Sequence, residues 1–166
     1  MTVLWRISNH CDLIGLGGER TNGRWHTSAR GKRIIYLSEH PALALIEALA
    51  NLKGDPALFP GTFQLMKVVG ADSIQSETVD SRSLPKQWRE DERRTRSIGD
   101  SWLKQSDSAL LRVPSAPLPE SSNFLLNPLH RDAATLNIEW CAWIDYDKRL
   151  FHVSAPIWRS TGTPLQ

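Results

Sequence analysis

A single carboxylate interrupts an uncharged, mostly apolar stretch of this sequence. Residues 41–52 read PALALIEALANL, and Glu47 is the one charged residue among these twelve. Proline is favoured at the first position of a helix, and the Gly-Asp-Pro sequence that begins at residue 54 is typical of a helix end. The segment therefore predicts a helix over residues 41–53. A charge in such surroundings destabilises a fold unless it faces water or has a polar partner.

The predicted helix places Glu47 at the border of its apolar face. Leu43, Ile46, Leu49 and Ala50 recur at helical spacing and predict the stripe that faces the core. At about 100° per residue, Glu47 lies beside that stripe. Its neighbours at i−3, i+1 and i+3 are alanines, which leave space beside the carboxylate. Two interpretations stay open, an exposed helix carboxylate or a carboxylate in a pocket, and the apolar surroundings favour the pocket.

The size and composition of the chain are those of one ordinary domain. Its 166 residues, 40% hydrophobic and 23% charged, suffice to bury a core. The net charge of +2 is too small to imply a nucleic-acid partner. We see no signal peptide and no run near the ~18 apolar residues of a membrane span, so we expect a cytoplasmic protein. Cys11 and Cys141 lie far apart in the sequence, which argues against a zinc site or a disulfide scaffold and fits a reducing compartment.

Alternation and turn signals predict a strand-rich chain around the helix. Short apolar or alternating runs predict strands at residues 3–7, 34–37, 62–69, 109–113, 136–143 and 150–153. Residues 9–33 are rich in glycine and predict a long loop, and residues 123–128 predict the start of a turn. Residues 80–97 interleave both charge signs and predict a solvated, partly helical surface, followed by a short helix at 98–103. We expect one domain, residues 1–155, and a C-terminal extension, residues 156–166.

Several common site patterns do not fit. The run Gly15-Leu16-Gly17-Gly18 lacks the third glycine of a dinucleotide-binding fingerprint, because Arg20 stands in its place. The five histidines have no metal-ligand spacing, and no serine lies in a Gly-x-Ser-x-Gly turn. Neither a metal site nor a hydrolase triad is predicted.

Four residues together suit an anionic, nucleotide-like ligand. Arg24 lies in the glycine-rich segment and can clamp a diphosphate with its planar guanidinium. Tyr36, on a predicted strand, can offer a flat face for stacking, and Glu47 can supply a carboxylate. Ser115 follows a proline in the Val-Pro-Ser-Ala segment, residues 113–116. Taken singly, each also has a structural interpretation, as a surface arginine, a core tyrosine, a surface carboxylate or a turn serine.

These residues, in this order, resemble the RES domain family, the toxin half of Xre–RES toxin–antitoxin pairs, which is named for an Arg, a Glu and a Ser. The matching segments span about residues 3–152: WRI at 5–7, GRWH at 23–26, IYL at 35–37, ALIEAL at 44–49, GDSW at 99–102, VPSA at 113–116, NFLLNP at 123–128 and DKRL at 147–150. Phe124 departs from the pattern, since the family often has tyrosine there.

The resemblance implies an α+β fold like that of diphtheria-toxin-type ADP-ribosyltransferases, with a split, mostly antiparallel β-sheet around an NAD+ cleft and flanking helices. It implies NAD+ as the substrate, no metal, and a toxin that cleaves the nicotinamide–ribose bond by hydrolysis or phosphorolysis and so arrests growth. ADP-ribosylation of a specific protein is the alternative activity. A non-enzymatic module that binds a helix-turn-helix partner is the alternative outside enzymology.

Carried over by position, the resemblance implies that Arg24, Tyr36, Glu47 and Ser115 form the active-site set. Glu47 would stabilise positive charge at the ribose, and Arg24 would hold the diphosphate. The implied ligand-binding residues are Arg6, Arg24, Trp25, Tyr36, Ser122 and Asn123. Ser122 lies close in sequence to Ser115, so the serine that meets the ligand stays open between these two.

The resemblance also implies partners. An Xre-like helix-turn-helix antitoxin would cover the cleft, and a homodimer of the toxin would lie inside a larger toxin–antitoxin complex. DNA would be contacted only through the antitoxin, and no membrane would be involved.

Overall fold

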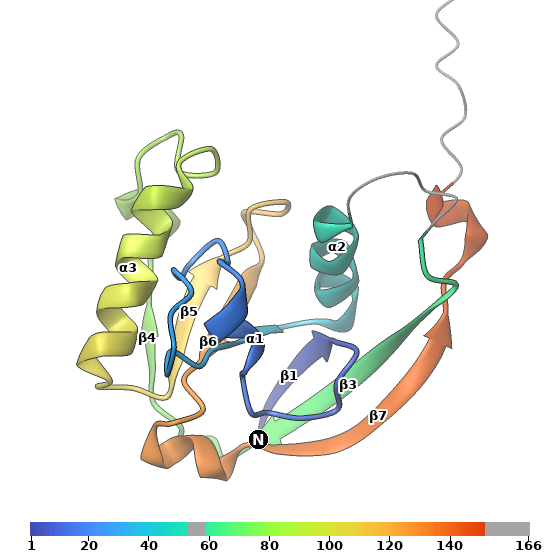
Figure 1. The fold of residues 1–166 in the computed structure, drawn as a ribbon, viewed down its shortest axis with the longest axis horizontal. Coiled ribbons are helices and arrows are strands. Elements are labelled where there is room, and N and C mark those ends of the chain that lie inside the picture. The colour runs from blue at the N-terminus through green and yellow to red at the C-terminus, as the bar shows by residue number, and fades with distance from the viewer. Residues whose placement is uncertain (53–58, 152–166) are drawn as a thin grey trace, which may run out of the picture.

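A computed structural model describes residues 1–52 and 59–151, in which seven strands form one sheet (Figure 1). The strands are β1 Thr2–Ile7, β2 Ile35–Ser38, β3 Thr62–Gly70, β4 Ser76–Thr78, β5 Leu110–Pro114, β6 Ser122–Leu126 and β7 Asn137–Asp145. Their order across the sheet is β4-β5-β6-β2-β1-β3-β7. Every neighbouring pair is antiparallel except β4 and β5, which are parallel. The predicted α+β class and mostly antiparallel sheet are confirmed.

Helices connect and cover the strands. They are α1 Gly17–Arg20, α2 Pro41–Asn51 and α3 Glu92–Gln105, with the 3-10 helices η2 Ser81–Ser83, η3 Arg131–Thr135 and η4 Lys148–Phe151. In Figure 1, α2 and α3 stand on either side of the loop that carries α1. Within the described ranges, no helix has the length and apolarity that a membrane crossing requires.

The sheet divides between β1 and β2. These strands are paired only at Trp5 and Ser38, whereas β1 pairs with β3 along its whole length. One half is thus β4-β5-β6-β2 and the other β1-β3-β7. Because ladder hydrogen bonds are few at the division, polar side chains from both halves can border a cavity there.

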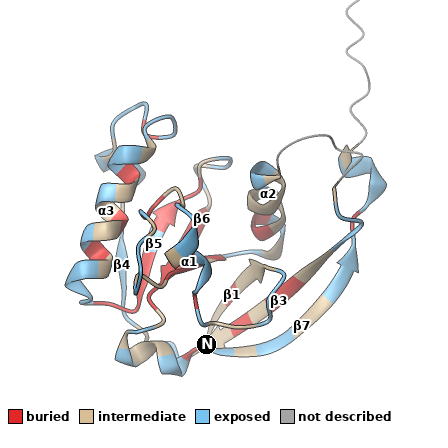
Figure 2. Cartoon of the chain, viewed as in Figure 1, coloured by how far each residue is buried: buried red, intermediate tan, exposed pale blue. Residues whose placement is uncertain are grey.

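Two apolar cores lie on opposite faces of the first half. Figure 2 shows buried residues in red along β5 and β6. On β5, Leu110 belongs to the core shared with β1 and β3, while the adjacent Leu111 belongs to the core beneath α3. That second core contains Trp25, Trp88 and Trp102. A strand covered on both faces needs apolar residues at successive positions, which explains the unbroken LL sequences of β5 and β6.

The same double burial explains one wrong prediction. Residues 123–128 predict a turn, but most of them belong to β6, a strand inside the sheet between β5 and β2. Leu125 and Leu126 are both buried, so the alternation that identifies a half-exposed strand is missing.

Helix α3 corrects a second prediction. It is one helix of 14 residues, Glu92–Gln105, and is longer at both ends than the short helix predicted at 98–103. Its first turns belong to the segment 80–97, for which a solvated, partly helical surface is predicted. The Asp91 carboxylate caps it by accepting from the Arg94 backbone N–H. Thr95, Gly99 and Trp102, spaced i, i+4 and i+7, are its buried residues, and dense charges on the other faces obscure this stripe in the sequence.

Helix α2 exists as predicted, but its buried face agrees with the predicted apolar stripe only in part. Leu43 and Ala44 are buried, whereas Ile46 is 37% exposed and Ala50 is also exposed. The helix is therefore rotated so that Glu47 is directed inward rather than lying at the edge of the buried face.

Smaller differences concern the ends of the chain. Leu150 and Phe151, predicted as part of a strand, belong to η4. Residues 152–153 and the predicted extension 156–166 lie outside the described residues. Helix α1 and strand β4 are too short to leave a sequence signal and were not predicted.

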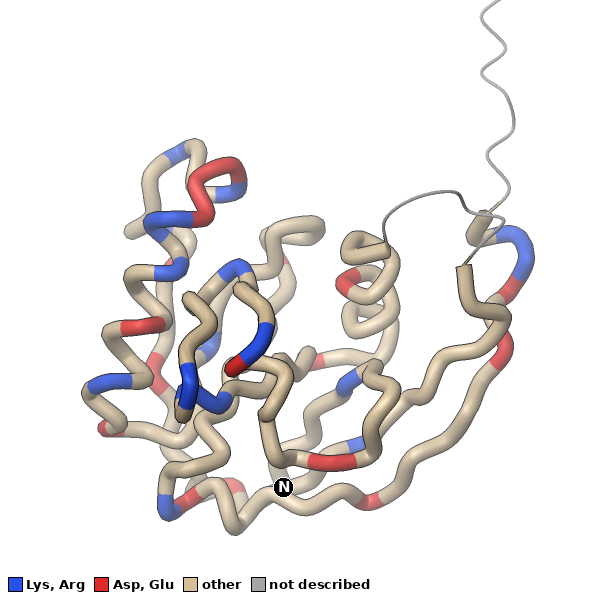
Figure 3. The backbone as a smooth tube through the Cα atoms, viewed as in Figure 1, with Lys and Arg blue, Asp and Glu red and all other residues tan. Residues whose placement is uncertain are grey.

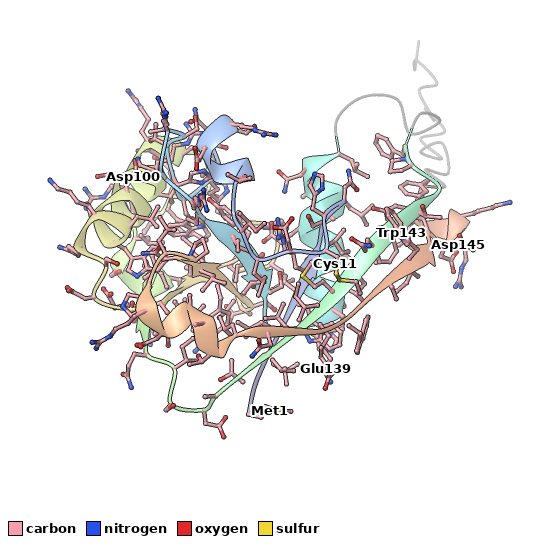
Figure 4. The ribbon with its side chains drawn as sticks, turned by 60° about the horizontal axis from the view of Figure 1, so that its bottom comes forward. Met1, Cys11, Asp100, Glu139, Trp143 and Asp145 are labelled. Carbon is pink, nitrogen blue, oxygen red and sulfur yellow. A yellow bond between two sulfur atoms is a disulfide. The ribbon has the colours of Figure 1, made fainter. Side chains whose placement is uncertain are left out.

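The cysteine prediction was also wrong. Cys11 and Cys141 form a disulfide with their Cα atoms 6.3 Å apart, although 130 positions separate them in the sequence (Figure 4). The loop after β1 and the edge strand β7 meet there. Sequence distance therefore did not argue against a disulfide, and the cysteines give no support for a reducing compartment.

Candidate active site

A cleft of about 570 Å³ lies where α2, β2 and β6 face the loop before β2 and the start of α3. Its volume is within the usual range for small-molecule sites. The polar residues that line it are Asn22, Arg24, Tyr36, Glu47, Asn51, Arg89, Glu92, Arg96 and Asn123. A smaller cavity of about 150 Å³ adjoins it and shares Tyr36, Glu47, Asn51 and Asn123, with Arg6 and Ser38 on its far side. Glu47 thus lies where the two cavities meet.

Two hydrogen bonds hold the Glu47 carboxylate. Its Oε1 atom accepts from Ser115 Oγ at 2.7 Å and from Asn123 Nδ2 at 2.5 Å. Within residues 1–52 and 59–151, no protein group donates to Oε2, so that oxygen is available to a ligand. The side chain is half-buried, and two hydrogen bonds satisfy one of its carboxylate oxygens. Glu47 therefore has the polar partners that a charged residue among apolar neighbours requires.

The two donors are themselves fixed. Ser115 is fully buried, and its Oγ also accepts from the Leu118 backbone N–H at 3.1 Å. The Asn123 side-chain oxygen accepts from Ser38 Oγ at 2.7 Å. Donors from the turn after β5 and from β6 therefore converge on one carboxylate oxygen of α2, and Ser38 on β2 fixes one of these donors, so the oxygen is preorganised.

Ser122 lies away from this group. Ser122 and Asn123 are consecutive on β6 and so point to opposite faces of the sheet. Ser122 Oγ accepts from Arg112 Nε at 2.9 Å, and the residue lines neither cavity beside Glu47. The serine brought to Glu47 is Ser115.

Arg24 stands on the opposite wall, against α3 and the turn before it. Its Nη1 donates to the Arg89 carbonyl at 2.7 Å, and its Nη2 is 3.7 Å from Glu92 Oε1. Arg96 pairs with the other oxygen of Glu92 and donates from Nε to the Gly23 carbonyl at 2.8 Å. The wall carries three guanidiniums and one carboxylate. Figure 3 shows Lys and Arg interleaved with Asp and Glu along α3, and further Lys and Arg along the loop that carries α1.

A close helix–loop contact positions that wall. A Cβ added at Gly99 would lie 1.8 Å from the Trp25 carbonyl oxygen, so only glycine allows α3 to approach the loop. Asp100 accepts from the Thr27 backbone N–H and from Lys32 Nζ, both at 3.0 Å. Burial raises the pKa of Asp100, but these hydrogen bonds outweigh it and hold that pKa below its usual value. The GDSW segment, residues 99–102, thus helps to hold this wall. We call it the arginine wall, and it consists of Arg24, Arg89, Arg96 and Glu92.

Tyr36 forms the floor between the walls. Its hydroxyl accepts from the Trp25 backbone N–H at 3.1 Å and lies 2.8 Å from His26 Nδ1. Burial raises the pKa of this hydroxyl, so it stays protonated. The Trp25 side chain is buried against Trp88, with ring centroids 6.0 Å apart, and its position in the core supports the loop.

Arg6 borders the smaller cavity from β1. Its Nη1 donates to the Asp12 carbonyl at 2.8 Å. Burial lowers the pKa of this guanidinium, while the Asp12 carboxylate raises it. Arg6 is therefore a second cation near Glu47, on the side away from Arg24.

Sequence reasoning missed Arg89, Glu92 and Arg96, because residues 80–97 predicted a solvated surface. The available signal was the i, i+4 spacing of Glu92 and Arg96, which places both on one face of a helix. As to metals, the described ranges contain no cluster of three His, Cys, Asp or Glu side chains placed to hold one. The arrangement can bind an anion at the arginine wall and stabilise developing positive charge near Glu47.

Comparison with known proteins agrees with the pattern of motifs. The family model described as "RES domain" matches residues 3–147. A protein named Toxin Res from Pseudomonas putida is 36% identical over 137 residues, covering 82% of this chain and 92% of its own. The Prs ADP-ribosylating toxin of a Sphingobium species is 31% identical over 159 residues, covering 90% and 96%. A Toxin Res from Yersinia enterocolitica is 33% identical over 123 residues, covering 73% and 78%.

Proposed function

This chain belongs to the RES domain family, and on that premise we propose that it is a toxin that consumes NAD+ by cleaving the nicotinamide–ribose bond. The observation that carries the proposal is the preorganised Glu47 carboxylate facing an arginine wall across a cleft. The names of the similar toxins support it, because ADP-ribosylation, named for the Sphingobium relative, uses NAD+ as the donor.

The chemistry requires little beyond charge stabilisation. The bond between the nicotinamide ring nitrogen and ribose C1′ breaks, and its electron pair leaves with nicotinamide, which becomes neutral. Because the leaving group is neutral, no strong general acid is needed. The ribose passes through an oxocarbenium-like state, as in glycoside cleavage, and Glu47 Oε2 stabilises its positive charge. Water or phosphate then adds an oxygen to C1′, and the proton of water is released to solvent.

Each wall has its own role in this proposal. Arg24 and Arg96 suit the diphosphate, since guanidiniums bind phosphate oxygens bidentately. Tyr36 offers its ring to the nicotinamide or ribose, and Arg6 borders the cavity beyond Glu47. Ser115 and Asn123 act by holding Glu47, and Trp25 acts by supporting the Arg24 loop.

The test is direct. Purified protein, free of any partner, is incubated with NAD+ with and without phosphate, and the products are followed by proton NMR. We expect nicotinamide release together with ADP-ribose or its 1″-phosphate. Intact NAD+ under both conditions would overturn the proposal.

A second candidate function is transfer of ADP-ribose to a specific protein, which the name of the Sphingobium relative favours. Adenine-labelled NAD+ distinguishes the two in a cell extract. Label retained on one polypeptide after denaturation supports transfer, whereas label recovered as free ADP-ribose supports hydrolysis.

We further propose that a partner controls this activity in the cytoplasm. An Xre-like helix-turn-helix antitoxin that covers the cleft would block NAD+, and DNA would be bound only through that antitoxin. A toxin homodimer would form the centre of the complex. Light scattering of the chain with and without the product of the adjacent gene tests the assembly. If Glu47→Ala alters assembly but not growth arrest, the chain is a binding module instead.

A further inference from the structure

The motif histidine His26 is buried, and both of its ring nitrogens have hydrogen-bond partners. Nε2 lies 3.1 Å from the Gly18 carbonyl oxygen, which can only accept. Nε2 must therefore carry the hydrogen, and in the neutral ring Nδ1 is left as an acceptor.

That acceptor determines the orientation of the Tyr36 hydroxyl. The hydroxyl is 2.8 Å from His26 Nδ1, so its proton is donated there. Its oxygen accepts the Trp25 backbone N–H at 3.1 Å. The order of donors is thus Trp25 to Tyr36, Tyr36 to His26, and His26 to Gly18. The Tyr36-to-His26 hydrogen bond depends on the neutral Nε2–H tautomer, because only that form leaves Nδ1 as an acceptor.

We propose that His26 is a positioning residue. It fixes the ring of Tyr36 at the floor of the cleft by accepting a hydrogen bond from the Tyr36 hydroxyl. The inference rests on the proposed function, because Tyr36 matters only if the cleft beside Glu47 binds the substrate. His26 lies behind Tyr36 and lines neither cavity, so it acts through the tyrosine.

The surrounding packing leaves the pair little freedom. A Cβ added at Gly23 would lie 2.2 Å from the Tyr36 hydroxyl oxygen and 2.6 Å from His26 Nδ1. The two rings pack with centroids 5.7 Å apart. Because Gly23 has no side chain, the Tyr36 hydroxyl and the His26 imidazole have room to contact each other there.

The arrangement makes the cleft sensitive to acid. Burial lowers the pKa of His26; the Gly18 and Thr21 carbonyls and the Asp100 carboxylate raise it, and Lys32 lowers it. Once protonated, Nδ1 becomes a donor aimed at a hydroxyl that already receives the Trp25 N–H. The Tyr36 proton then loses its acceptor inside a buried contact, so the hydrogen bond that orients the hydroxyl is lost. Activity should therefore fall as the pH drops below the ordinary range of histidine titration.

NMR of the wild-type chain tests the tautomer without any turnover. Long-range proton–nitrogen spectra of the histidine rings should show His26 as the neutral Nε2–H form at pH 7. An Nδ1–H tautomer, or a charged ring at pH 7, would overturn the proposal. If the tautomer is as expected but NAD+ stays intact, the proposed function fails and not this hydrogen-bond arrangement.

A double-mutant cycle tests the positioning role. We expect His26→Asn and Tyr36→Phe each to lower kcat/KM about ten-fold, and the double variant to lower it no further. The acid limb of the pH profile should disappear in His26→Asn. His10→Asn, at an exposed histidine outside both cavities, is the matched control and should leave kcat/KM and the profile unchanged. Additive losses, or an acid limb that persists in a folded His26→Asn variant, would overturn the role.

Discussion

The two walls of the cleft are built by different means. The Glu47 carboxylate is held on one oxygen by buried donors, Ser115 and Asn123, and each of these is fixed by a further hydrogen bond. Arg24 is instead partly exposed and shares the Glu92 carboxylate with Arg96. One wall is a buried polar network and the other a solvated cluster of charges.

The difference teaches what each wall can contribute. A group that stabilises a short-lived positive charge must already be in place, because reorganising it during the reaction costs free energy. A group that binds a flexible diphosphate needs charge more than a fixed position. In the ligand-free protein Glu92 balances the guanidiniums, and a ligand phosphate would compete with it. We therefore expect changes at the Glu47 wall to act on kcat and changes at the arginine wall to act on KM.

The largest effect should come from Glu47→Gln. The amide preserves the shape but removes the charge, so kcat should fall about 10²- to 10³-fold and growth arrest should be lost. Nicotinamide release measures the loss of rate, and circular dichroism checks that the variant keeps its fold. Glu120→Gln, an exposed carboxylate outside the cleft, is the control. Full activity in Glu47→Gln would place the chemistry elsewhere.

Gly99→Ala should disturb the arginine wall as a whole. The new methyl would meet the Trp25 carbonyl, so α3 must move away, at a cost of about 3 kcal/mol in the free energy of unfolding. KM should rise while kcat changes less. Denaturant unfolding and steady-state kinetics measure both. Gly17→Ala, where an added Cβ has open space, should change neither, and an equal loss there would remove the argument for close packing.

Ser115→Ala should weaken the Glu47 wall without removing its charge. Glu47 would keep the bond from Asn123 but lose the hydroxyl, and we expect kcat to fall about ten-fold. The comparison with Ser122→Ala is decisive, because Ser122 bonds Arg112 on the other face of the sheet. A larger loss of kcat in Ser122→Ala would reverse the choice between these serines.

The smallest effect should come from Glu92→Gln. Removing the shared carboxylate makes the wall more positive, and at low salt KM for NAD+ should fall about three-fold. Because both ion pairs are partly exposed, the effect should shrink at high salt. A rise in KM would mean that Glu92 positions Arg24, and the two walls would then be alike in being preorganised.

How far the sequence predicts the site differs between the walls. Glu47 stands out because the signal is local: the other eleven residues of segment 41–52 carry no charge. Arg96 does not stand out, since it lies among other charges of both signs and its role comes from contacts with Gly23 and Glu92. A unique charge is visible in a sequence, whereas one chosen charge among many is not.

By itself the sequence determined helix α2, most of the strands and the set of motifs that identifies the family. These depend on local spacing and residue type, which a linear pattern retains, and the resemblance to the family implied the α+β class. The tertiary structure decided which way α2 turns, that Cys11 meets Cys141, that β6 lies inside the sheet, and that Ser115 rather than Ser122 reaches Glu47. Those contacts join residues tens of positions apart; for example, 68 positions separate Glu47 from Ser115 in the sequence. They depend on how strands pair and faces pack, which no local periodicity encodes.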